Sequence, residues 1–166
     1  MEELNFYQQK PKQSYCASDN IQNIVEAAGK DLLIQWNIRY KNFCDERRFD
    51  KFWGKDVDKP NLIIWYNDKP ALLDWKGKQS KGWSANEQAV KFYERLQKEL
   101  NIPILICFIT FDENEYIAER RFAVINSHAY VENKKPPERN KNVMFKDELP
   151  IFNKENLLKY VFEINN

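Results

Sequence analysis

The 166-residue sequence has few of the residues on which several classes of site depend. It holds four glycines and no glycine-rich motif that cradles phosphate, which excludes a nucleotide-binding loop of that kind. His128 is the only histidine, we assign it no role, and its isolation argues against a histidine-based catalytic triad. Cys16, Cys44 and Cys107 are widely spaced, without CxxC pairs or a neighbouring histidine cluster. Their spacing argues against a disulfide framework, structural zinc or an iron–sulfur cluster, and predicts a reducing, intracellular compartment.

Long hydrophobic runs and an excess of one charge are also missing. The longest apolar run, 102–111, is too short to span a bilayer, and the N-terminal residues lack the apolar core of a signal peptide. We therefore expect a cytoplasmic protein with no membrane partner. Lys and Arg total 26 against 25 Asp and Glu, so any basic footprint for nucleic acid must be local. Two stretches, 76–81 and 134–146, are locally basic, with a solvated surface as the alternative for each.

At this length, with 43% hydrophobic residues, the chain fits one domain large enough to bury a core. Residues 1–17 lack periodicity and predict an N-terminal arm, followed by a single domain over 18–166. The expected elements are a helix from 18 or 19 ended by Gly29, a strand over 32–40, an aromatic-packed loop or short helix over 41–59, a hairpin over 61–76, a basic loop over 77–83, a helix from Ser84 to about Leu100, strands over 104–111 and 116–125, a loop over 133–146 and a closing helix over 153–164.

Residues 60–76 predict a β-hairpin that ends in an acid and a lysine. The apolar runs 62–66 and 71–75 are joined by turn-favouring residues, so they should pair antiparallel. Because strand side chains alternate between faces, Asp74 and Lys76 project to the same side. A carboxylate beside an ammonium at the end of a buried strand is typical of sites that hold a divalent metal and position an attacking water. The pattern therefore indicates nuclease chemistry, with a chance Asp-x-Lys as the alternative.

The order of these motifs resembles that of the PD-(D/E)XK nuclease superfamily, and the hairpin is similar to that of archaeal Holliday junction resolvases and viral nucleases. In that family a Pro-Asp opens the second strand and an acid-x-Lys closes the third. Here Pro60-Asn61 and Asp74-Trp75-Lys76 stand at the matching separation, and Ile102-Pro103 leads into a hydrophobic strand. The resemblance covers about 19–111. It implies an α/β fold with a restriction-endonuclease-like αβββαβ core, in which helices flank a mixed central sheet.

The resemblance also implies roles for the residues of the motif. Lys76 is expected beside the attacking water, where its ammonium orients the water and stabilises charge on the phosphorane. A helical acid before the first strand is often a further metal ligand in this family, and Glu26 matches it, with a solvated helix charge as the alternative. The expected ligands of Mg²⁺ or Mn²⁺ are Asp74, the main-chain carbonyl of Trp75, Asn61, Glu26 and Asp58.

Four residues after the hairpin are candidates for contact with nucleic acid. Lys78 and Lys81 continue the basic stretch that begins at Lys76. Trp83 can stack on an unpaired base, with a lid over the core as the alternative. Gln88 falls where related nucleases place a polar residue near the phosphate, with an ordinary surface glutamine as the alternative.

Asn61 stands where the family carries aspartate. An amide oxygen can ligate Mg²⁺, but it lacks the negative charge that compensates ion dehydration. Three accounts are open. Asp58 or Asp56 takes over as a displaced ligand; Asn61 is an inactivating replacement, natural or introduced, in a protein that binds nucleic acid; or the fold has been kept and the chemistry lost.

The sequence as a whole predicts a metal-dependent nuclease that hydrolyses phosphodiester bonds of DNA in recombination, repair or the processing of a viral or mobile-element genome. DNA is the expected partner, with RNA as the alternative and a homodimer as the candidate assembly. Two other functions stay open. One is a catalytically attenuated protein of the same fold that binds nucleic acid, and the other is a non-enzymatic α/β domain that binds a partner protein.

Overall fold

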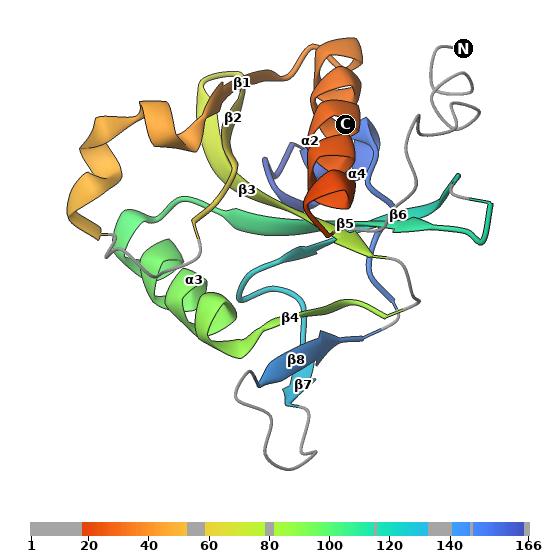
Figure 1. The fold of residues 1–166 in the computed structure, drawn as a ribbon. Coiled ribbons are helices and arrows are strands. Elements are labelled where there is room, and N and C mark those ends of the chain that lie inside the picture. The colour runs from red at the N-terminus through yellow and green to blue at the C-terminus, as the bar shows by residue number, and fades with distance from the viewer. Residues whose placement is uncertain are drawn as a thin grey trace.

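The computed structural model describes residues 18–52, 59–78, 82–114, 116–132, 141–146 and 148–164. The arm expected over 1–17 lies outside the described residues, as do Asp56, Asp58 and Lys81. The described chain contains both helices and strands (Figure 1). In order they are α2 (Ser18–Gln35), β1 (Arg39–Asn42), the 3₁₀ helices η1 (Phe43–Asp45) and η2 (Arg47–Phe52), β2 (Leu62–Tyr66), β3 (Lys69–Lys78), β4 (Ser84–Asn86), α3 (Glu87–Leu100), β5 (Ile104–Phe111), β6 (Ile117–Val124), β7 (Tyr130–Glu132), β8 (Asn142–Phe145) and α4 (Lys154–Tyr160).

A five-stranded mixed sheet in the order β1-β2-β3-β5-β6 forms the centre of the fold. Neighbouring strands are antiparallel except for β3 and β5, which run parallel and are joined through α3. A helix, three antiparallel strands, a helix and a parallel strand therefore follow one another along the chain. The αβββαβ core with a mixed sheet, predicted from the sequence, is confirmed.

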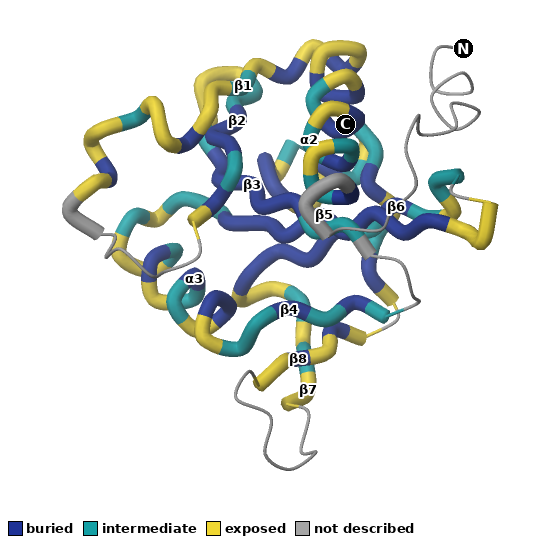
Figure 2. Tube along the Cα trace, in the orientation of Figure 1, coloured by how far each residue is buried: buried dark blue, intermediate teal, exposed yellow. Residues whose placement is uncertain are grey.

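Two hydrophobic cores cover the two faces of this sheet. Side chains of α2 and α4 pack on one face, and side chains of α3 and of the small β4-β8-β7 sheet pack on the other. The central strand β5 is buried along its whole length, as expected for a strand covered on both faces (Figure 2). Along β3, Leu73 and Trp75 belong to the first core, and Leu72 belongs to the second. Asp74 therefore points to the α3 side of the sheet.

The predicted hairpin is formed by β2 and β3, with a turn tighter than the sequence indicated. Asn67 and Asp68 both have positive φ, 47° and 63°, which is the geometry of a two-residue hairpin turn. Lys69 and Pro70, expected in the turn, already belong to β3. Leu62 pairs with Leu73. This register places the residue before β2, Asn61, opposite Asp74.

Gly29 does not end the first helix, contrary to the sequence-based expectation. Helix α2 continues to Gln35, so 32–35 are helical rather than the start of a strand, and the strand begins at Arg39. A Cβ atom on Gly29 would lie 2.2 Å from Cη2 of Trp75, so glycine is required for the close approach of helix and sheet. The helix stops before Asn37, which adopts a left-handed φ of 57°.

Two short strands and one helix boundary also differ from the expectation. The second helix begins at Glu87 rather than Ser84, because the side chain of Asn86 accepts hydrogen bonds from two free N–H groups of its first turn. Ser84 lies in β4, which pairs with β8 inside the segment expected to be a loop. Both strands are short, and they pair across a long stretch of sequence that carries no local signal for the pairing.

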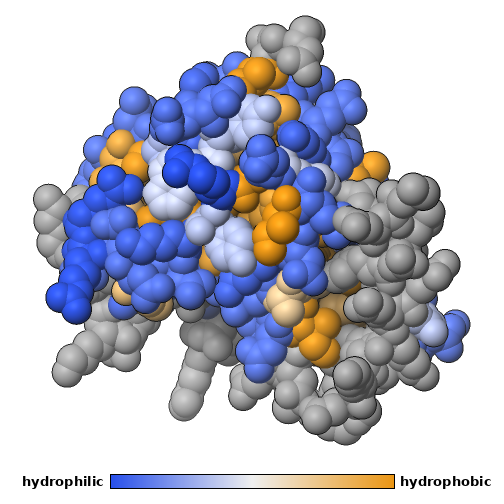
Figure 3. Space-filling model, turned by 90° about the horizontal axis from the view of Figure 1, so that it is seen from above, coloured by the Kyte–Doolittle hydropathy of each residue, from blue (hydrophilic) through white to orange (hydrophobic). Residues whose placement is uncertain are grey.

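The described surface on the face seen in Figure 3 is largely hydrophilic, and hydrophobic residues form small patches there between hydrophilic ones. No helix in the described parts of the chain is long and apolar enough to cross a membrane.

Replacement of Gly29 by alanine tests the helix–sheet contact. Alanine normally stabilises a helix by about 1 kcal/mol relative to glycine. Here we expect Gly29→Ala to lower the free energy of unfolding by about 1–3 kcal/mol, because the added methyl group overlaps the Trp75 ring. Urea denaturation measures the difference, with Asn23→Ala at an exposed position of the same helix as the control. A Gly29→Ala variant as stable as the control would contradict the packing.

Candidate active site

The candidate site lies where β3 continues beyond the start of β2. The main-chain N–H of Asn61 donates to the carbonyl of Leu73 at 2.9 Å, the last main-chain bond between the two strands on this side. From Asp74 onward this edge of β3 has no neighbouring strand among the described residues. The main-chain groups of Trp75 that face this edge therefore need partners of another kind, because buried N–H and C=O groups are costly to leave unpaired.

Two side-chain amides supply these partners. The N–H of Trp75 donates to Oδ1 of Asn61 at 2.7 Å, and Nε2 of Gln22 donates to the carbonyl oxygen of Trp75 at 2.9 Å. Asn61 comes from the loop before β2, and Gln22 comes from the first turns of α2. The two amides thus take the place of a strand at the edge of β3.

Glu26 joins the same network from the next turn of α2. Its Oε1 accepts hydrogen bonds from Nδ2 of Asn61 at 3.0 Å and from Nε2 of Gln22 at 3.3 Å. The side chain is half-buried rather than a freely solvated helix charge. The fold therefore brings Glu26 and Asn61, two of the residues proposed as metal ligands, into direct contact.

Asp74 projects from β3 toward α3 and is 3% exposed. Its Oδ2 accepts a hydrogen bond from the hydroxyl of the fully buried Tyr93 at 3.1 Å. Nζ of Lys76 lies 3.3 Å from the same oxygen, and the lysine side chain is 28% exposed. A buried carboxylate is stable only with such partners. In this ion pair the carboxylate of Asp74 therefore lies in the core, while the side chain of Lys76 contacts solvent.

The residues proposed to contact nucleic acid lie in different settings. Lys78 ends β3, but its side chain is outside the described residues, as is all of Lys81. Gln88 is exposed in the first turn of α3. Trp83 is 6% exposed and packs against Phe108, with ring centroids 5.9 Å apart. Burial leaves little of the Trp83 ring for stacking on a base and favours its alternative role as a lid over the core.

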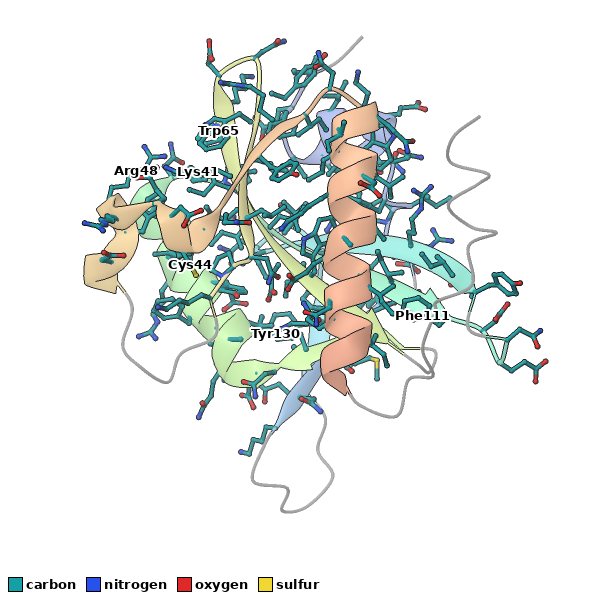
Figure 4. The ribbon with its side chains drawn as sticks, turned by 45° about the horizontal axis from the view of Figure 1, so that its top comes forward. Lys41, Cys44, Arg48, Trp65, Phe111 and Tyr130 are labelled. Atoms are coloured by element: carbon teal, nitrogen blue, oxygen red, sulfur yellow. The ribbon has the colours of Figure 1, made fainter. Side chains whose placement is uncertain are left out.

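A cluster of cations that the sequence analysis did not select lies beside β1 and η2, where each cation has an acid within ion-pair distance (Figure 4). The guanidinium of Arg39 lies 5.8 Å from the ring centre of the half-buried Trp65. Lys41 and Arg48 both approach Glu46, at 3.7 and 3.5 Å. Such exposed ion pairs are weak, about 0–1 kcal/mol, so phosphate groups can compete for these cations.

The oxygen donors at this edge fit a hard divalent cation in kind. They comprise the carboxylates of Asp74 and Glu26, the amide of Asn61 and the carbonyl of Trp75, and Mg²⁺ is bound by oxygen ligands of these types. The oxygens of Asn61 and Trp75 belong to neutral groups and already accept N–H hydrogen bonds. The negative charge available to a cation therefore comes from the carboxylates of Asp74 and Glu26. Within the described ranges no group of three or more His, Cys, Asp or Glu side chains is close enough to hold a metal.

Gln22 and Tyr93 are site residues that the sequence analysis missed. Nothing in the local sequence pattern separates a buried core tyrosine such as Tyr93 from one that donates a hydrogen bond to an acid. Gln22 precedes Glu26 by one helical turn, so the two share a face. That spacing is a signal that could have identified it.

The hydrogen bond of Tyr93 can be tested by removing the hydroxyl group alone. Tyr93→Phe leaves a buried carboxylate with one donor fewer, so we expect the free energy of unfolding to fall by about 1.5–3 kcal/mol. The control is Tyr130→Phe, which removes the 2.6 Å bond between Tyr130 and the more exposed Glu94, the contact that raises the pKa of Tyr130 to about 12. The control should lose less stability. If both variants lose the same small amount of unfolding free energy in urea, the buried carboxylate of Asp74 does not need the hydroxyl group of Tyr93.

Comparisons with known proteins give a resemblance in structure. No protein-family model matches the chain, and no curated protein matches it in sequence. Among solved structures, the chain is similar to Hjc, a Holliday junction resolvase of the archaeal hyperthermophile Archaeoglobus fulgidus. The TM-score is 0.47 and the sequence identity 8%, and the match covers 76% of this chain and 88% of the resolvase chain.

Proposed function

We propose that the protein is a metal-dependent nuclease that hydrolyses phosphodiester bonds of DNA. The observation that supports this most directly is the Asp74–Lys76 pair, with Nζ 3.3 Å from Oδ2, at the open edge of β3 in an αβββαβ core. The acid is held in the core by Tyr93, while the ammonium reaches solvent. A phosphodiester approaching this edge would meet a lysine and a fixed carboxylate together.

Each residue of the site has a distinct proposed role. Lys76 orients the attacking water and stabilises the charge that develops on the phosphorane, because its ammonium is preorganised by the ion pair with Asp74. Asp74 and Glu26 are the anionic ligands of Mg²⁺ or Mn²⁺, and Asn61 and the carbonyl of Trp75 are neutral ones. When bound, the ion makes a coordinated water more acidic and screens the charge of the scissile phosphate.

The proposed substrate is DNA, with RNA as the alternative, and the proposed setting is recombination, repair or the processing of a viral or mobile-element genome in the cytoplasm. Lys78, Lys81 and the exposed Gln88 are proposed to contact the nucleic acid near the scissile phosphate. Lys41 and Arg48 offer a second place for the phosphate backbone, because their only described ion-pair partner is the shared Glu46. A homodimer is the proposed assembly.

One observation favours a second candidate, a catalytically attenuated protein that binds nucleic acid through the same face. Asn61 supplies no charge, and its oxygen already accepts a short hydrogen bond of 2.7 Å from Trp75. Mg²⁺ gives up its waters reluctantly, so a site with one acid fewer binds it more weakly. Affinity for DNA in Ca²⁺ without cleavage in Mg²⁺ or Mn²⁺ identifies this candidate.

Substitution of the acid and the lysine tests the nuclease directly. Asp74→Ala should abolish Mg²⁺-dependent cleavage of DNA, because the ion loses its main anionic ligand, and Lys76→Ala should reduce the turnover rate by about 10²-fold or more. Asp68→Ala and Lys159→Ala, which remove an exposed acid and an exposed lysine outside the site, should cleave as the unsubstituted protein does. Cleavage that survives Asp74→Ala would assign the activity to another site or to a contaminant.

Replacing Asn61 by aspartate tests whether the missing negative charge at this position limits metal binding. Asn61→Asp should tighten Mg²⁺ binding and raise cleavage, because hard cations favour anionic oxygen ligands. If Asp58 has taken over as a ligand, Asp58→Ala abolishes cleavage instead and Asn61→Asp changes it little. Titration of Mg²⁺ and Mn²⁺ against cleavage in both variants separates these accounts. If both variants fold but cleave neither DNA nor RNA, the nuclease proposal is wrong and the candidate that only binds nucleic acid remains.

A further inference from the structure

Both polar atoms of the Asn61 side-chain amide form hydrogen bonds. Oδ1 accepts the N–H of Trp75 at 2.7 Å, and Nδ2 donates to Oε1 of Glu26 at 3.0 Å. One neutral side chain therefore joins the edge of β3 to helix α2. Gln22 makes a parallel connection, since its Nε2 reaches both the carbonyl of Trp75 at 2.9 Å and Oε1 of Glu26 at 3.3 Å.

We infer that Asn61 is a positioning residue that assembles the candidate site without a cation. It holds the main chain of Trp75, and hence its neighbours Asp74 and Lys76, while its NH₂ group fixes the Glu26 carboxylate beside it. A negative group 3.0 Å from a carboxylate oxygen would need a cation or a proton between them. The amide removes that need because it presents a donor to the acid.

The opposite case shows what the amide contributes. An aspartate at position 61 could still accept the N–H of Trp75, but it would have no donor for Glu26. Two carboxylates at hydrogen-bonding distance repel each other strongly in a half-buried setting. The edge of β3 would then separate from α2 until a divalent cation bound both acids. Cation-independent assembly of the unsubstituted protein is thus a property of the Asn61–Glu26 pair.

A swap of the two groups tests the inference. In Glu26→Gln/Asn61→Asp the acid and the amide exchange places, so a donor again faces a carboxylate. In EDTA we expect Asn61→Asp to lower the unfolding temperature by roughly 4–8 °C, Glu26→Gln to lower it less, and the double variant to recover most of the loss. Addition of Mg²⁺ or Ca²⁺ should restore Asn61→Asp and should raise its unfolding temperature by more than it raises that of the unsubstituted protein.

A matched control separates this effect from that of added charge. Asn86→Asp makes the same chemical change at a site where Asn86 Oδ1 accepts two main-chain N–H bonds at the start of α3. A carboxylate caps a helix as well as an amide does, so the unfolding temperature should not fall and should not depend on Mg²⁺.

Hydrogen exchange at the Trp75 amide reports on positioning directly. Asn61→Ala should speed this exchange at least tenfold relative to the amides of β5, because the N–H of Trp75 loses its acceptor. Should Asn61→Asp fail to fold, the double variant and Asn61→Ala decide the outcome.

Three results would each overturn the inference: no recovery in the double variant, no restoration of Asn61→Asp by cations, or an unsubstituted protein that cations stabilise equally. None of these measurements involves cleavage. Failure of the proposed nuclease activity is therefore distinguishable from failure of this inference.

Discussion

The open edge of β3 is the constraint on which the rest of the site depends. A strand that continues past its neighbour leaves main-chain groups unpaired, and the fold meets this requirement at Trp75 with the amides of Asn61 and Gln22. Gln22 reaches the edge only because α2 lies close to the sheet. That closeness in turn requires Gly29, where a side chain would overlap the Trp75 ring. Packing on one face of β3 thus positions the polar groups at its edge.

Successive side chains of β3 point to opposite faces of the sheet, so the residues of the site are divided between the two hydrophobic cores. Trp75 is buried with α2 and α4, while Asp74 is held on the other face by Tyr93 of α3. An acid placed this deeply lowers stability unless donors surround it, and Tyr93 and Lys76 are such donors. Residues kept in spite of such a cost are common at functional sites, where a fixed charge is required for chemistry. The arrangement at Asp74 is consistent with that pattern.

Local signals in the sequence predicted the hairpin and the presence of the core helices. Asn67 and Asp68 tolerate the left-handed backbone of a tight turn, and the two apolar runs on either side of them identified both strands. Gly29 was misread because a glycine that ends a helix and one that permits close packing look the same in a single sequence. Strands β4 and β8 were missed because each is short and pairs with a partner distant in the chain.

The sequence by itself determined the αβββαβ order and the placement of Asp74 and Lys76 on one face, since both follow from periodicities of a few residues. Only the tertiary structure decided what surrounds them. The bonds of Asn61 to Trp75 and Glu26, and of Tyr93 to Asp74, join residues from different elements. Such contacts depend on the distance between a helix and the sheet on which it packs. Many side chains together determine that distance, and no spacing of residues along the chain encodes it.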